Sequence, residues 1–139
     1  MIAVRNREMN MSRYAFGKTV AMDFDAAIDK VTQALAKEGF GVLTEIDVAA
    51  TLKNKLGQEI PPYRILGACN PQFASQALAA EPAIGALLPC NVVVRVDAGG
   101  HTQVEFMDPD AVLRLVDHLE VARLAGEVRQ RLVRVMEAL

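Results

Sequence analysis

The chain has 139 residues, of which 52% are hydrophobic, so one domain can form a core without a metal or a disulfide. Fifteen lysines and arginines against seventeen acidic residues give a net charge of −2, and only 5% of residues are aromatic, which argues against the basic patches and stacking platforms of nucleic-acid-binding proteins. The apolar stretches are too short to span a membrane, and residues 1–10 lack a signal-peptide core, so we expect a cytoplasmic protein with no nucleic-acid or membrane partner.

Hydrophobic periodicity predicts alternating strands and helices after a polar start. We expect residues 1–12 to form a flexible leader and residues 13–139 to form a single α+β domain. The predicted elements are strands over 14–22, 40–47, 63–69, 90–97 and 101–107, and helices over 24–38, 48–56, 70–81 and 108–139. The period of the last helical region slips between Asp117 and Glu120, which allows two helices, and Gly126 within it indicates a close neighbour.

Polar residues mark where the predicted helices begin, because their side chains can accept hydrogen bonds from the free N–H groups of the first turn. The predicted N-caps are Asp23, Asp47, Asn70 and Asp108. Two of these caps are followed by proline, Pro71 and Pro109, at the first helical position, where the missing N–H group costs nothing. Glycine at Gly39 is a natural stop for the first helix.

The last two strands are joined by a glycine-rich turn, Ala98-Gly99-Gly100, which predicts a hairpin. A hairpin favours an antiparallel sheet, and amphipathic helices would cover one face of it. We therefore predict a single antiparallel sheet of four to five strands with helices packed on one face. Residues 92–94 are all valine, so both faces of their strand need cover, and we predict that a second subunit supplies it in a homodimer.

The strand predicted over 40–47 alternates in a regular way. Phe40, Val42, Thr44 and Ile46 share one parity, so we expect them to share one face of the sheet. The region after the following helix is harder to interpret. Glu59, Tyr63 and Arg64 lie around a double proline, where they either line a cleft or occupy solvated loop positions, and we favour the second interpretation.

Four segments resemble those of a known family. They are Gly39-Phe40-Gly41-Val42-Leu43-Thr44-Glu45-Ile46-Asp47, Tyr63-Arg64-Ile65-Leu66-Gly67-Ala68-Cys69-Asn70-Pro71, Leu88-Pro89-Cys90-Asn91-Val92-Val93-Val94 and Asp108-Pro109. In this order, over Tyr14 to Leu139, they resemble the bacterial and archaeal family called domain of unknown function 302. The resemblance implies a TATA-binding-protein-like fold with a curved antiparallel sheet, and it also suggests a dimer. It implies no established reaction and supplies no catalytic residues.

The two cysteines are the most informative residues of the chain. Each lies beside an asparagine, as Cys69-Asn70 before a helix start and as Cys90-Asn91 at the start of a strand. One interpretation is a ligand site built from these four residues and the N–H groups of the helix start, which also stabilise a thiolate. A second interpretation is a redox pair. The third, which we favour for the thiols themselves, is two buried and reduced small hydrophobic side chains.

No motif indicates a metal, a cofactor or a catalytic nucleophile. The cysteines form no Cys-x-x-Cys or Cys-x-x-His pattern, and His101 and His118 are predicted in a turn and on a late helix. The two serines, Ser12 and Ser75, lie outside any Gly-x-Ser-x-Gly turn. We therefore predict no metal, no cofactor and no catalytic residue.

These observations favour a non-enzymatic, homodimeric small-ligand-binding or sensory module. Its candidate ligand-binding residues are Cys69, Asn70, Cys90 and Asn91. The alternative is a thiol-dependent redox protein or enzyme, with Cys69 as nucleophile and Cys90 as resolving thiol. The two hypotheses differ in geometry, because a binding site needs a concave pocket, whereas a resolving pair needs α-carbons within about 7 Å of each other.

Overall fold

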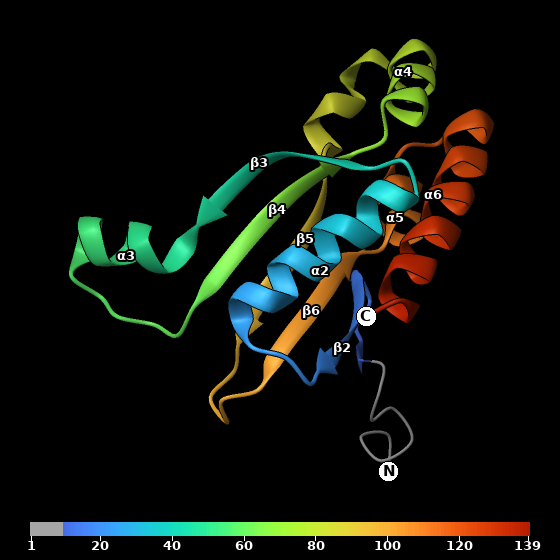
Figure 1. Ribbon diagram of the computed structural model, residues 1–139. Helices are drawn as coiled ribbons and strands as arrows, with labels where there is room; N and C mark the ends of the chain where they lie inside the picture. Colours follow the sequence, from blue (N-terminus) through green and yellow to red (C-terminus); the bar gives the residue numbers. More distant parts are fainter. Residues whose placement is uncertain (1–9) are drawn as a thin grey trace.

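The computed structural model describes residues 10–139, and an antiparallel sheet lies at its centre (Figure 1). The strand order within these residues is β1-β2-β6-β5-β4-β3. The bounds are β1 Asn10–Met11, β2 Ala15–Val20, β3 Gly41–Asp47, β4 Tyr63–Cys69, β5 Cys90–Val96 and β6 Thr102–Met107. The predicted α+β class and the five predicted strands are confirmed. The short strand β1 is formed by the end of the segment predicted as a leader, of which residues 1–9 lie outside the described part.

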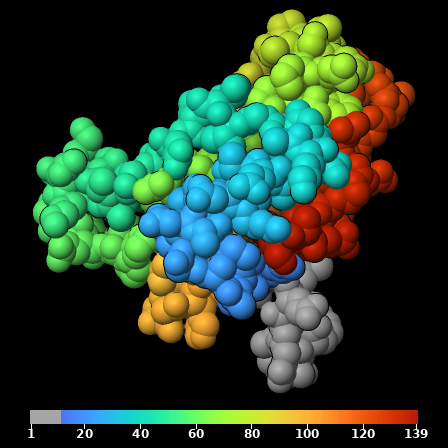
Figure 2. Space-filling view, viewed as in Figure 1, coloured from blue at the N-terminus to red at the C-terminus, as the bar shows by residue number. Residues whose placement is uncertain are grey.

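Helices α2 and α6 pack against one face of this sheet (Figure 1). The helical bounds are α2 Phe24–Lys37, α3 Val48–Leu56, α4 Pro71–Ala80, α5 Pro109–Val112 and α6 Leu119–Glu137, with 3-10 turns η1 Pro82–Leu87 and η2 Leu113–Leu115. Helix α3 contains no buried residue, and it projects from the body beyond the end of the edge strand β3 (Figure 2). None of the helices within residues 10–139 combines the length and the apolar composition needed to cross a bilayer.

The predicted capping interactions are confirmed. The backbone N–H groups of Ala26, Ala50 and Asp110 donate to the carboxylates of Asp23 at 2.8 Å, Asp47 at 2.9 Å and Asp108 at 3.0 Å. The last helical region is interrupted where its period slips, and α6 starts after the interruption. There the ring Nδ1 of His118 accepts a hydrogen bond from the backbone N–H of Glu120 at 3.1 Å, a capping role that the sequence did not indicate.

The main core lies between the sheet and these two helices. Its fully buried members alternate along the central strands and recur at helical spacing on α2 and α6; they include Leu66, Val92, Val94, Val104, Phe106, Val31, Leu35 and Leu132. Phe16 of β2 stacks on Phe106 of β6, with ring centroids 5.6 Å apart. This core fixes the helices on the sheet but does not include the whole of α4.

A second, smaller core holds α4 in place. Its buried residues come from α4, η1, η2 and the first half of α6, and they are Ala77, Ile84, Leu113, Val121, Leu124 and Ala125. Helix α4 is therefore anchored mainly to α6 and lies beyond the end of the sheet (Figure 1). The region between the two cores is bounded by the ends of β4 and β5 on one side and by α4 on the other.

Strand β3 departs from the regular alternation that the sequence suggested. Val42 pairs with Ala68, and Thr44 pairs with the adjacent Gly67, so Leu43 is the extra residue of a β-bulge. Because a bulge reverses the alternation, Val42 and Thr44 lie on opposite faces of the sheet, and the expectation of one shared face was wrong. The bulge also leaves the Leu43 side chain 68% exposed.

The other face of the sheet carries a continuous cross-strand row. Pairing registers align Gly17, Glu105, Val93, Ile65 and Ile46 across the five long strands. Ile46 is 49% exposed, and Val93 and Ile65 are half-buried, so this row is only partly covered by the described chain. Next to it the guanidinium of Arg95 donates to Glu105, with Nε 2.7 Å from Oε1.

Replacing Gly126 with alanine should stabilise the protein. The sequence suggested a close neighbour at this helical glycine, but a Cβ atom built there would meet only Asp110 Oδ1, at 4.0 Å. The alanine variant should gain about 0.5–1 kcal/mol, because glycine loses more backbone entropy in a helix. Urea unfolding would measure this gain. Ala122→Gly, on the exposed side of the same helix, should lose a similar amount, and a destabilised Gly126→Ala variant would contradict the structure.

Candidate functional site

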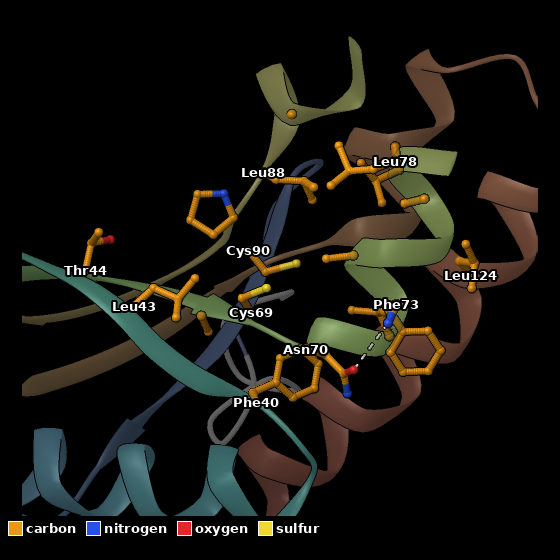
Figure 3. A pocket seen from close by; sticks show the side chains of 17 residues that line it. Phe40, Leu43, Thr44, Cys69, Asn70, Phe73, Leu78, Leu88, Cys90 and Leu124 are labelled. Carbon is orange, nitrogen blue, oxygen red and sulfur yellow. Dashed lines mark hydrogen bonds between the residues drawn. The ribbon is translucent and has the colours of Figure 1, made fainter. Parts of the chain in front are cut away.

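A cavity of about 380 Å³ lies between α4 and the adjoining ends of β4 and β5, and we call it the α4 cavity (Figure 3). Helix α4 packs against α6 in the smaller core, whereas the strand ends belong to the main core. The cavity is therefore lined by residues of both cores. The lining residues are Phe40, Leu43, Thr44, Ala68, Cys69, Asn70, Phe73, Ala74, Ala77, Leu78, Gly85, Leu88, Pro89, Cys90, Leu113, Leu124 and Val128. Most of these side chains are apolar.

Three of the four candidate residues from the sequence come together at this cavity. Cys69 ends β4, Asn70 caps α4 and Cys90 begins β5, and all three line the cavity. Asn91 does not line it. Successive residues of a strand point to opposite faces, so Asn91 is exposed on the other side of β5, where it pairs with Gly67.

The two cysteines are free thiols that both face the cavity (Figure 3). Cys69 is half-buried, whereas Cys90 is only 7% exposed. Burial raises the pKa of the Cys90 thiol from 9.0 to about 12, and the nearby Cys69 adds a smaller electrostatic contribution in the same direction. Cys90 is therefore a neutral thiol at physiological pH, which makes it a poor nucleophile.

Asn70 is occupied by the structure around it. Its Oδ1 accepts hydrogen bonds from the backbone N–H groups of Gln72 at 3.2 Å and Phe73 at 3.3 Å. The N–H groups that the sequence offered as ligand donors are thus satisfied by the cap itself. Its Nδ2 lies beside Gly39, where an added Cβ atom would be 2.9 Å away. Asn70 therefore joins the start of α4 to the end of α2.

Comparison with known proteins places the chain in a family. A family model described as "Domain of unknown function DUF302" matches residues 16–139. The chain belongs to the DUF302 family. This confirms the resemblance carried by the four sequence segments. A search of curated proteins found no match.

A solved structure supports the same assignment. The DUF302 chain is similar to the crystal structure of an uncharacterized conserved DUF302 protein from Bacillus stearothermophilus, with 26% sequence identity and a TM-score of 0.84. The match covers 91% of this chain and 98% of that chain. The family and the fold are therefore established, and the chemistry of the site has to be argued from the residues themselves.

The apolar lining of the α4 cavity is the part of the site that sequence reasoning missed. None of its described lining residues is an aspartate, a glutamate, a lysine, an arginine or a histidine. Two exposed leucines belong to it, Leu78 on α4 at 42% and Leu43 on β3 at 68%, but their exposure is a property of the fold and not of the sequence. Both lie at the cavity, but their positions on separate elements give no sequence pattern.

A second cleft of about 530 Å³ lies between α3, the start of α2 and β4. Glu59, Tyr63 and Arg64 line it. Glu59 is an exposed loop residue, as we favoured, whereas Tyr63 and Arg64 are half-buried residues of β4. Its charged groups are largely paired with one another. Lys53 Nζ lies 3.4 Å from Glu59 Oε1, and Arg64 Nη2 lies 3.4 Å from Asp47 Oδ2. This pairing makes the cleft a weaker candidate site than the α4 cavity.

Proposed function

We propose that this DUF302 protein is a non-enzymatic module that binds a small ligand in the α4 cavity. The observation that carries the proposal is a cavity of about 380 Å³ with a mainly apolar lining. Its volume is within the range of about 300–1,000 Å³ that is typical of small-molecule sites. The absence of histidine, carboxylate and lysine side chains from the described lining favours binding over acid–base catalysis, because these are the groups that most often transfer protons in active sites.

Filling the cavity should abolish binding of an apolar probe. Ala74 lines the cavity from α4, so Ala74→Leu would place three additional carbon atoms in the ligand volume. With N-phenyl-1-naphthylamine, an uncharged dye that fluoresces in apolar surroundings, we expect the dissociation constant to rise at least tenfold. Ala79→Leu is the matched control, because Ala79 is exposed on the same helix and lies outside the lining. Equal binding by both variants, each folded by circular dichroism, would overturn the proposal.

The redox alternative has one observation in its favour, since both thiols face the same cavity. The high pKa of Cys90 weighs against it, because a resolving thiol attacks as the thiolate. If the pair were redox-active, the oxidant glutathione disulfide would convert it to a disulfide and would itself be reduced to two glutathione thiols. We expect glutathione disulfide to leave both cysteines free by mass spectrometry, and formation of a Cys69–Cys90 disulfide would favour the alternative.

We also propose a homodimer that forms through the face of the sheet opposite α2 and α6. The half-covered row through Val93, Ile65 and Ile46 supplies apolar surface, and Arg95 with Glu105 places both signs of charge beside it. A surface with both charges close together can be complementary to a second copy of itself across a two-fold axis. Two free cysteines support a reducing compartment, so we place the dimer in the cytoplasm.

Light scattering would test the dimer. We expect twice the 15.1 kDa mass of one chain at micromolar concentration. Ile65→Lys should dissociate the dimer, because its cross-strand neighbours Val93 and Ile46 are apolar and the interface would bury an unpaired ammonium group. Ala122→Lys adds the same charge on the exposed side of α6 and should leave the mass unchanged. A wild-type mass near 15.1 kDa at every concentration would contradict the dimer.

A further inference from the structure

The chemistry of the α4 cavity restricts what it can hold. An ionised ligand group needs an opposite charge or several hydrogen bonds to replace the water that it loses. The described lining supplies no charged side chain for this purpose. Arg131 lies behind the lining residue Phe73, with its Cζ 5.1 Å from the ring centroid, and its Nη1 donates to the carbonyl of Glu38 at 3.0 Å.

The hydrogen-bonding groups of the cavity are equally limited. Asn70 Oδ1 is used by two backbone N–H groups at the start of α4. Cys90 remains protonated at neutral pH, and a thiol is a weak donor and a weak acceptor. Thr44 carries the one hydroxyl group among the described lining residues. A ligand with many polar groups would leave most of them without a partner.

Burial distinguishes the mouth of the cavity from its floor. The floor is formed by buried side chains that include Ala68, Cys90 and Leu124, whereas Thr44 and Leu78 are exposed at the mouth. In Figure 3, Thr44 and Leu124 lie on opposite sides of the cavity. A polar group of the ligand would keep its contact with water at the mouth, beside the Thr44 hydroxyl.

We propose that the ligand of the α4 cavity is an uncharged and predominantly hydrocarbon molecule, with at most one polar group held at the mouth near Thr44. This inference rests on the proposed binding function and specifies the class of ligand. It excludes nucleotides, sugar phosphates, amino acids and fatty-acid anions, each of which would bring an ionised group or many hydroxyl groups into the apolar lining.

Two dyes with the same ring skeleton test the charge requirement directly. N-phenyl-1-naphthylamine is uncharged, and 1-anilinonaphthalene-8-sulfonate carries one sulfonate on the same rings. We expect the uncharged dye to bind at least tenfold more tightly, with binding that Ala74→Leu weakens and Ala79→Leu preserves. Leu78→Lys would add a cation at the mouth and should raise the affinity for the sulfonate at least threefold, whereas Ala79→Lys should not.

The outcomes separate the inference from the binding function. If the sulfonate binds as tightly as the uncharged dye, and Ala74→Leu weakens both, the cavity binds ligands but the charge inference is wrong. If neither dye binds in a manner that Ala74→Leu weakens, the binding function is overturned and the inference falls with it. If the wild type prefers the uncharged dye, and Leu78→Lys reduces this preference while Ala79→Lys does not, the binding function and the charge inference are both supported.

Discussion

Replacing Gly17 with alanine is expected to destabilise the protein by about 3 kcal/mol. Gly17 lies in β2, and a Cβ atom built on it would overlap the carbonyl oxygen of Val104 and approach Glu105 Cα to 2.8 Å. Both contacts are with the backbone of β6, which cannot rotate away as a side chain could. Strands β2 and β6 would have to separate locally, at the place where Phe16 stacks on Phe106.

A matched substitution isolates this close approach from the general effect of adding a methyl group to a strand. Gly41 lies in β3, at the edge of the sheet, and a Cβ atom built there meets nothing within 4 Å. Gly41→Ala should therefore be neutral or stabilising by up to about 1 kcal/mol, because alanine reduces the entropy of the unfolded chain. Urea unfolding compares the two variants. Similar stabilities for Gly17→Ala and Gly41→Ala would show that β2 and β6 do not approach as described.

Alkylation of Cys90 is expected to be roughly a thousandfold slower in the folded protein than in the unfolded chain at pH 8. The thiolate is the reactive form, and a pKa of about 12 in place of 9.0 lowers its population by this factor. The measurement uses the Cys69→Ser variant, so that iodoacetamide can react only at Cys90, with and without urea. Folded and unfolded rates within tenfold of each other would show that Cys90 is neither buried nor protonated.

The raised pKa also has a consequence for stability. Well below pH 9.0 the thiol is protonated in both states, and its contribution to stability is fully present. As the pH rises from 9.0 through about 12, the unfolded chain loses this proton while the folded protein keeps it, so the free energy of unfolding should fall. A Cys90→Ala variant should lose less stability over this range, and an identical pH dependence for both proteins would contradict the assignment.

The elements of this fold could be predicted from the sequence because their signals are local. A cap and its helix lie within a few residues of each other, as for Asp23 and Asp108, and the hairpin between β5 and β6 depends on one short turn. The two η turns are missing from the prediction because short 3-10 segments carry no clear periodicity. The α-helices and long strands, by contrast, follow the predicted order.

The candidate site was less predictable, because its geometry depends on contacts between distant segments. Cys69 and Cys90 both line the cavity because they lie at neighbouring strand ends, but the apolar cavity beside them depends on α4 packing against α6. The assignment of Asn91 failed for a physical reason: an asparagine next to Cys90 in a strand necessarily points to the other face. The bulge at Leu43 could not be predicted, because the side chains of residues 40–47 alternate regularly in the sequence and do not indicate an inserted residue.

The projecting helix α3 has a consequence for the dynamics of the protein. No residue of α3 is buried, and a nine-residue helix is marginally stable without packing, so its backbone depends on the Asp47 cap and the left-handed Gly57 at its end. Amide hydrogens of α3 should therefore exchange with solvent through local fraying. Those of α6, whose inner face is part of both cores, should exchange only when the whole molecule opens. Helix α3 can thus lose and regain its structure many times within the lifetime of one folded molecule.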